Sequence, residues 1–276
     1  MNKPDNPQFA ILNEFTEIEA RANYYMSAPK EFLSKYKVKT LKVGSFRVVM
    51  IAGLNLEFFN RIVGLGVREE ATPMMLDDAI AVMQKEGNTN FIVQVCPHAQ
   101  PAAIHEWLLT RGFVRGREQA KFFRDNALPP VCPIDLRIEL IGVESATAFA
   151  DIIITVFNMS PELHPLMKGP VGKPGWRHYL AYAGKQPVAA AAMFIKNDIG
   201  WLGFGSTIEG QRRLGAQGAL IARRLQDGID LGCRWFVSET AASTPEKQSP
   251  SYQNMVRGGF ELAYLRPDFV FRQQQL

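Results

Sequence analysis

The stretch TIEGQRRLGAQGALIARRL, residues 207–225, combines arginines and glycines where a strand-like segment passes into a helix. The first backbone N–H groups of a helix lack partners within it, and with the helix dipole they form a site for an anion. Glycines let the backbone approach such a ligand closely. Arg212 and Arg213 are either a solvated pair or a pair that a bound anion stabilises. We favour the anion, because cations at a helix start otherwise oppose the dipole.

Two common nucleotide-binding motifs do not fit this turn. A P-loop requires GxxxxGK followed by Ser or Thr, and no Lys-Ser or Lys-Thr pair follows the glycines here. A GxGxxG fingerprint opens a parallel βαβ unit. Here the turn follows residues 178–207, whose alternation and two turns predict a three-stranded antiparallel meander.

The elements around the turn predict a mixed α/β domain. In the segment after the glycines, Ile221, Leu225 and Ile229 recur at helical spacing. The other expected elements of this half are strands at 136–140 and 234–239, helices at 145–157 and 249–257, a short helix or loop at 161–173, and a closing pair of strands in FELAYLRPDFVF, residues 260–271.

The N-terminal half has a similar order of elements, and a helix followed by a Gly-Phe corner recurs with Phe113 and Phe260 147 residues apart. This suggests an internal duplication. We expect two domains, residues 1–128 and 135–276, joined by a proline-rich linker at 129–134. The expected elements of the first half are helices at 8–25, 72–86 and 101–111 and strands at 47–51, 60–64, 90–96 and 113–124, with Thr72 as N-cap and Pro73 as first residue of the second helix.

Arg212 to Ala216 fit the pattern R-x-x-G-x-(G/A) up to its last position, where Gln217 stands, with Gly218 next. In this context the stretch resembles the pyrophosphate loop of the GNAT superfamily of acyl-CoA N-acyltransferases. The resemblance covers the C-terminal half in element order: strand, two helices, three antiparallel strands, Gly-rich loop and helix, strand, helix and two strands. It implies an α/β (α+β) fold with a mixed, mainly antiparallel central sheet flanked by helices, in two tandem copies.

The resemblance implies that the third meander strand and the loop bind acetyl-CoA. Loop N–H groups would hold the pyrophosphate, helped by Arg212 or Arg213, and pantetheine would pair with the end of the strand. A backbone N–H of that strand would stabilise the oxyanion during direct attack by an amine, without a covalent enzyme intermediate. Ser249 and Asn254 either contact the coenzyme or only cap and decorate their helix. The residues assigned to the coenzyme are Ser206, Thr207, Ile208, Arg212, Arg213, Leu214, Gly215, Ala216, Gln217, Gly218, Ala219, Ser249 and Asn254.

Glu239, at the carboxyl end of the strand that would border the thioester, is the predicted general base, with His178 as second candidate. The family often has an acidic tyrosine four residues before the glycine of its Gly-Phe pair. Met255 stands there, and Tyr252 is the nearest substitute. Both residues also have a purely structural interpretation. Glu239 could be a cap or a salt-bridge partner, and Tyr252 could be an aromatic side chain packed under the final helix. Gln217 also departs from the family, which has a small residue there, although its backbone N–H is unaffected.

The counterpart of the Gly-rich turn in the first half is VGLGVREEATP, residues 63–73. Glu69 and Glu70 lie where pyrophosphate would bind, and the Arg-x-x-Gly-x-Gly pattern is absent. This half therefore resembles a degenerate GNAT domain that does not bind coenzyme A. It either shapes the acceptor cleft or is a structural domain without a site.

Composition excludes several classes of function. The net charge is +4 without a dense basic run, which argues against a nucleic-acid partner. The longest apolar run, 187–195, is too short for a bilayer, and the first ten residues lack a signal-peptide core, so we expect no membrane partner and a cytoplasmic location. Three separated cysteines and four scattered histidines indicate neither disulfides nor a metal site.

We therefore expect an N-acetyltransferase that moves an acetyl group from acetyl-CoA to a primary amine of a small molecule, protein or peptide. Two alternatives stay open: a non-catalytic acyl-CoA-binding or sensing protein, and a transferase of a larger acyl or aminoacyl group. The variable segment 158–176 indicates no particular acceptor, and the sequence gives no oligomeric state.

Overall fold

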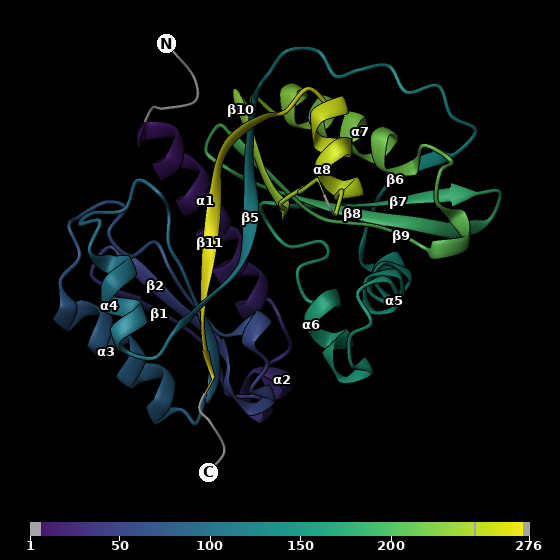
Figure 1. The fold of residues 1–276 in the computed structure, drawn as a ribbon. Coiled ribbons are helices and arrows are strands. Elements are labelled where there is room, and N and C mark those ends of the chain that lie inside the picture. Colours follow the sequence, from purple (N-terminus) through teal and green to yellow (C-terminus); the bar gives the residue numbers. More distant parts are fainter. Residues whose placement is uncertain (1–6, 246, 273–276) are drawn as a thin grey trace. The chain divides into compact units, whose positions relative to one another are not determined.

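The computed structural model describes residues 7–245 and 247–272, and the chain divides into two compact units (Figure 1). The first contains the chain up to Met26, Lys30–Lys121 and the chain from Ala263 on. The second contains Ser27–Pro29 and Phe122–Leu262. Every residue assigned to the coenzyme or to catalysis lies in the second unit, as does the proline-rich segment 129–134.

The first unit has strands in the order β1-β2-β3-β4-β11-β5. β3 and β4 are parallel, whereas β1 with β2, β2 with β3 and β4 with β11 are antiparallel. Its buried core includes Phe46, Phe91 and Phe113. The elements are α1 Pro7–Met26, α2 Lys30–Lys35, β1 Val38–Val43, β2 Phe46–Ile51, η1 Ala52–Leu54, η2 Glu57–Phe59, β3 Arg61–Val63, α3 Pro73–Lys85, β4 Asn90–Gln94, α4 Ile104–Thr110, β5 Val114–Asp125 and β11 Glu261–Arg272. The last four residues of β5 and the first two of β11 are counted in the second unit.

The second unit has strands in the order β10-β9-β8-β7-β6. The predicted meander is confirmed as β7, β8 and β9, and β9 pairs with β10 in parallel. In Figure 1, α7 and α8 lie on one face of this sheet and α5 on the other. The elements are β6 Arg137–Ile141, η3 Val143–Ser145, α5 Ala146–Val156, η4 Pro161–Leu163, α6 His164–Lys168, β7 Trp176–Ala183, β8 Gln186–Lys196, β9 Ile199–Thr207, η5 Glu209–Gln211, α7 Ala216–Asp230, β10 Trp235–Ala241 and α8 Pro250–Arg257.

Local sequence signals set several boundaries as predicted. The hydroxyl of Thr72 accepts a hydrogen bond from the N–H of Met75 at 3.3 Å, and Pro73 begins α3. A hydroxyl cap satisfies one free donor at the helix start, and proline has no N–H to satisfy there. The predicted N-cap is therefore confirmed.

The predicted closing pair of strands is wrong, because residues 261–272 form the single strand β11. Pro267 does not interrupt it: its φ suits extended backbone, and its carbonyl accepts a hydrogen bond from the N–H of Val95 at 3.3 Å. From Asp268 to Arg272 the strand pairs with β4. Pairing with a distant segment of the chain is part of what the residues of this stretch do as one strand.

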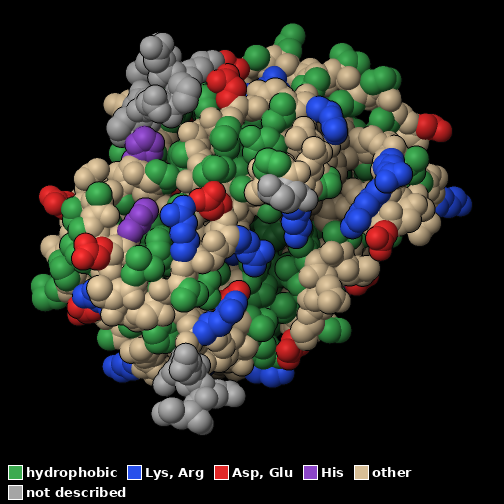
Figure 2. All heavy atoms as spheres, in the orientation of Figure 1, with side chains coloured by type: hydrophobic (Ala, Val, Ile, Leu, Met, Phe, Trp, Pro, Cys, Tyr) green, Lys and Arg blue, Asp and Glu red, His purple; other side chains and the backbone are tan. Residues whose placement is uncertain are grey.

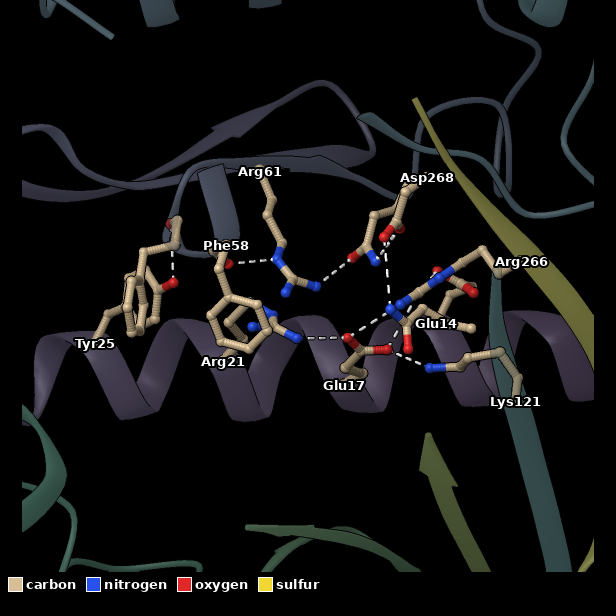
Figure 3. Close-up of polar contacts among 12 residues, drawn as sticks. Glu14, Glu17, Arg21, Tyr25, Phe58, Arg61, Lys121, Arg266 and Asp268 are labelled. Atoms are coloured by element: carbon tan, nitrogen blue, oxygen red, sulfur yellow. Dashed lines mark hydrogen bonds and ion pairs between the residues drawn. The ribbon is translucent and has the colours of Figure 1, made fainter. Parts of the chain in front are cut away.

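A buried charge network holds β11 in the first unit (Figure 3). Arg266 donates to the Glu14 carboxylate at 2.7 Å, and both side chains are 0% exposed. Glu17, one turn further along α1, pairs with Arg266 at 3.1 Å and also with Lys121 of β5. Burial favours the neutral form of Glu17, but Arg266, Lys121 and Arg21 hold its pKa well below the ordinary value. Because a buried charge is costly without its partner, this network fixes the pairing of these segments.

The surface carries charges of both signs. On the face shown in Figure 2, basic and acidic side chains are interspersed with apolar and neutral ones, as a net charge of +4 leads one to expect. No helix in the described part of the chain is both long enough and apolar enough to cross a bilayer.

Candidate functional site

The site begins where β9 and β10 separate. Their parallel pairing runs from Ile199 with Trp235 to Leu202 with Ser238. Beyond these pairs, β9 continues to Thr207 and β10 to Ala241. The backbone of β9 therefore has one edge free of this pairing over residues 203–207.

A β-bulge lies at the same point of β9. Ala192 of β8 pairs with Gly203 and Ala190 with Ser206, so two residues of β9 lie opposite one of β8. Phe204 within the bulge has φ +58°, a left-handed conformation that non-glycine residues seldom adopt. Bulges re-aim backbone groups and concentrate near active sites. The sequence held a signal for this feature, since Gly203 and Gly205 flank Phe204 inside a strand.

The start of α7 has no side chain that caps it. Its N-cap is Gly215, with φ +77°, and no side-chain hydrogen bond satisfies the first turn. The N–H groups of Ala216, Gln217 and Gly218 precede the first helical bond, in which Ala219 donates to the carbonyl of Gly215 at 3.1 Å. These donors and the helix dipole are arranged for an anion.

Two arginines lie beside this helix start. The side chain of Arg212 is 55% exposed and its guanidinium lies 3.7 Å from the Glu209 carboxylate, an exposed contact of little strength. Arg213 is exposed and has φ +69°, and Leu214 is half exposed. The structure therefore brings the predicted loop residues together around one helix start.

Gln217 connects the loop to β9. Its side-chain amide donates to the carbonyl oxygen of Ser206 at 2.9 Å and to the hydroxyl of Thr207 at 3.0 Å. The long side chain thus turns back onto the strand. It leaves the helix start clear of its own bulk.

The proline-rich segment packs behind the loop. A Cβ added at Gly215 would lie 2.6 Å from Cγ2 of Ile134, and one at Gly218 would lie 3.4 Å from Sγ of Cys132. Gly215 is therefore required by both its conformation and its neighbour. A substitution there would disturb the fold as well as any anion site.

Glu239 is the first residue of β10 beyond the part paired with β9. Side chains alternate along a strand, and Phe236 lies against Gly228 of α7, where an added Cβ would be 2.4 Å away. Glu239 therefore lies on the face opposite α7, partly exposed. This position suits a base that receives a proton from an acceptor on that face.

The candidates on α8 have structural partners. The Tyr252 ring meets that of Phe122 at right angles, with centroids 4.9 Å apart. Ser249 caps α8 by accepting from the N–H of Tyr252 at 3.3 Å, and Asn254 accepts from Arg257 at 3.1 Å. Met255 is buried. These contacts account for the residues structurally, and their assignment to the coenzyme or to acid catalysis stays a prediction.

His178 lies inside an aromatic cluster. Its ring is 4.8 Å from that of Phe149 and 5.4 Å from that of Trp176, centroid to centroid. Only 1% of the residue is exposed, and neither ring nitrogen has a hydrogen-bond partner among the described residues. Burial lowers the pKa of His178 to about 3, so the ring is neutral at physiological pH and a weak base.

The counterpart turn in the first unit is closed by its own side chains. Thr72 and Pro73 cap and occupy the start of α3, and Glu69 accepts a hydrogen bond from the N–H of Ser45 at 2.8 Å. A Cβ added at Gly66 would lie 2.6 Å from the carbonyl oxygen of Gln100. The donors that α7 leaves open are thus covered or missing in α3.

The donor set fits a coenzyme A diphosphate and pantetheine better than it fits a metal. An uncapped helix start, two adjacent arginines and a free strand edge offer mostly N–H donors, which bind phosphate and amide oxygens. Among the described residues, no group of three or more His, Cys, Asp or Glu side chains is arranged to hold a metal ion.

Sequence reasoning missed one residue of this region. Arg224 of α7 is 1% exposed and donates to the carbonyl of Gly203 in the bulge at 3.3 Å. A signal was present, because Arg224 lies on the same helical stripe as Ile221 and Leu225. A cation on an otherwise apolar stripe indicates either a buried contact or a helix that is not packed there.

Comparison with known proteins supports the fold. No protein-family profile matches the chain, and no curated protein matches it in sequence. Among solved structures it is similar to a GCN5-related N-acetyltransferase from Kribbella flavida, with a TM-score of 0.62, 17% identity and coverage of 92% of this chain and 97% of the other. A GCN5-related N-acetyltransferase from Sphaerobacter thermophilus gives a TM-score of 0.62 at 13% identity, covering 99% and 96%. A tandem GNAT protein from the clavulanic acid biosynthesis pathway gives 0.56 at 14% identity, covering 94% of each chain.

The chain therefore has the fold of the GNAT acetyltransferases in the tandem arrangement. The predicted fold class, mixed α/β with a mainly antiparallel sheet flanked by helices, is confirmed.

Proposed function

We propose that the second unit is an N-acyltransferase that moves an acetyl group from acetyl-CoA to a primary amine. The contrast between two helix starts carries this proposal. α7 begins at a glycine with no side-chain cap, whereas Thr72 and Pro73 close the start of α3 in the first unit. An uncapped helix start is costly unless water or a ligand satisfies it. The free edge of β9 next to it supplies the strand along which pantetheine would pair.

Each part of the proposed site has a distinct task. Arg212, Arg213 and the N–H groups of residues 214–219 would bind the diphosphate, and residues 206–208 would hold pantetheine. The coenzyme supplies an acyl thioester, whose C–S bond is exchanged for a C–N bond while the thiol gains the proton that the amine loses. Glu239 would accept that proton directly or through water. A backbone N–H in the β9 bulge would stabilise the negative charge on the carbonyl oxygen.

Calorimetry with two acyl donors, acetyl-CoA and S-acetyl-pantetheine, tests the diphosphate contact. Arg212→Ala with Arg213→Ala should raise the Kd of acetyl-CoA about tenfold or more, since charge-assisted hydrogen bonds are worth roughly 1.5–3 kcal/mol. The Kd of S-acetyl-pantetheine, which lacks the diphosphate, should not change. Arg234→Ala, which removes an exposed arginine paired with Asp198 at the start of β10, is the matched control. Equal Kd values for acetyl-CoA in all three proteins would refute the proposal.

A second candidate function is acyl-CoA binding without transfer. The packing of Tyr252 against Phe122 and the methionine at position 255 favour it, because both leave the thiolate without an obvious acid. Release of free thiol over a panel of amines separates the two candidates. Transfer predicts release that Glu239→Gln lowers by about 10²-fold or more. Tight binding without release from any amine, and no effect of Glu239→Gln, would favour the sensor. The N-terminal unit, the acceptor and the cytoplasmic location stay predictions.

A further inference from the structure

Arg224 places a positive charge beneath the β9 bulge. The residue is 1% exposed on the face of α7 that packs on the sheet, next to Leu220, Ile221 and Leu225 along the helix. Among the described residues no carboxylate lies within ion-pair distance of its guanidinium. Burial lowers the pKa of Arg224 to about 10, which leaves the group charged at neutral pH.

The guanidinium donates to backbone carbonyls of two strands. Nε donates to the carbonyl of Leu220 in its own helix at 3.0 Å. Nη1 donates to the carbonyls of Ala192 at 3.0 Å and Gly203 at 3.3 Å. Ala192 and Gly203 are register partners at the edge of the bulge. One nitrogen of Arg224 therefore lies between β8 and β9 where the ladder is interrupted.

This contact sets the direction of the next backbone N–H. In a trans peptide group the C=O and the N–H point in opposite directions. The carbonyl of Gly203 points toward β8 and Arg224, so the N–H of the same peptide group, which belongs to Phe204, points toward the side on which β10 has separated. That side is the free edge of β9 described above.

We propose that Arg224 is a positioning residue for acyl transfer: it holds the Gly203–Phe204 peptide group and strengthens the Phe204 N–H that stabilises negative charge on the acyl carbonyl oxygen. A charged donor on the carbonyl polarises the whole peptide group, because hydrogen bonds in a chain reinforce one another. This inference rests on the proposed function.

A purely structural role explains less. Bulge carbonyls need donors, but a neutral side chain would satisfy them without burying a charge. A buried cation without a counter-ion is costly, and Nη2 of Arg224 has no hydrogen-bond partner among the described residues. Negative charge that appears only during the reaction gives this cation a reason to be there.

Infrared spectroscopy of bound acetyl-CoA, the acyl donor, tests the inference without an amine that accepts the acyl group. With acetyl-CoA labelled with ¹³C at the carbonyl, the C=O band of the wild-type complex should lie below that of free acetyl-CoA. Arg224→Gln, which keeps a donor but removes the charge, should move the band back toward the free value and leave the Kd within about twofold. Arg223→Gln is the matched control, because this neighbouring arginine pairs with Asp227 at 2.8 Å near the surface.

Arg224→Lys gives a second, internally controlled reading. Burial lowers the pKa of a lysine below its ordinary value of about 10.4, so the introduced lysine can be neutralised by raising the pH. The carbonyl band should rise with that titration in Arg224→Lys and stay fixed in the wild type. In the protein without acetyl-CoA, the NMR signal of the Phe204 amide proton should shift upfield in Arg224→Gln relative to the wild type. Where an accepting amine is known, the transfer rate should fall roughly 10-fold to 100-fold, less than the 10²–10³ for deleting an oxyanion donor.

The outcomes separate the inference from the proposed function. If Arg224→Gln binds acetyl-CoA as the wild type does and both the carbonyl band and the Phe204 shift are unchanged, the role of Arg224 is structural only. A band in Arg224→Lys that does not move with pH contradicts the inference in the same way. If the wild-type protein does not bind acetyl-CoA, the proposed function fails and the inference with it.

Discussion

The side-chain amide of Gln217 donates to the carbonyl oxygen of Ser206 at 2.9 Å and so ties the first turn of α7 to the end of β9. The two segments have different proposed tasks, since one would bind diphosphate and the other pantetheine. A single neutral side chain therefore sets the distance between them.

Gln217→Ala should weaken donor binding. The change removes two neutral hydrogen bonds, to Ser206 and to Thr207, each worth about 0.5–1.5 kcal/mol, so the Kd of acetyl-CoA should rise about fivefold or more. Calorimetry measures the change. Gln226→Ala is the control, because that amide reaches only the exposed Asp230 of the same helix. An equal Kd for both variants would mean that the backbone holds the loop unaided.

The two loop glycines should respond oppositely to alanine. Gly215→Ala should lower the free energy of unfolding by about 1–3 kcal/mol, since φ is +77° and the new Cβ would lie 2.6 Å from Ile134. Gly218→Ala should be neutral or stabilising by up to about 1 kcal/mol, because its Cβ would make an ordinary contact with Cys132 at 3.4 Å in a helical turn. Urea denaturation compares them. Similar losses for both variants would contradict the described packing.

Removing the Glu17 charge should destabilise the first unit strongly. Glu17→Gln leaves Lys121 and Arg266 with less compensation in a buried site and should cost about 3–5 kcal/mol. Glu19→Gln on the same helix breaks a partly exposed pair with Arg47 and should cost less than about 1 kcal/mol. Thermal denaturation of both variants gives the comparison. A small loss for Glu17→Gln would show that Glu14 alone compensates these cations.

His178 should make stability depend on pH between about 3 and 6.5. Its folded-state pKa is about 3, below the ordinary 6.5, so in this window the unfolded chain binds a proton that the folded protein does not. Stability therefore rises with pH, with a slope approaching about 1.4 kcal/mol per pH unit, and the contribution is complete above pH 6.5.

Urea denaturation of the wild type and of His178→Phe between pH 5 and 7 isolates this contribution. Glu17, whose pKa is lowered from 4.5, loses its stabilising effect only at lower pH. The pKa of His105 is also lowered, but His105 is present in both proteins. Parallel pH profiles for the two proteins would show that His178 titrates normally.

Residues with local signals were predictable, and residues that depend on distant partners were not. Thr72 with Pro73, and the glycines before α7, fix backbone geometry within a few residues, and both appear where the sequence placed them. The course of β11 depends on pairing with β4, which lies far away along the chain, and the expectation of two strands failed there. The contact of Arg224 with Gly203 likewise depends on how α7 packs on the sheet.

The place of β11 has a consequence for how the protein is made. Residues 263–272 complete the sheet of the first unit and bring Tyr264 and Arg266 to Glu14 and Glu17 of α1. A ribosome produces α1 long before β11. Until translation reaches this strand, the first unit lacks an inner strand and Glu14 and Glu17 lack Arg266, so chaperones have a long interval in which to bind the nascent chain.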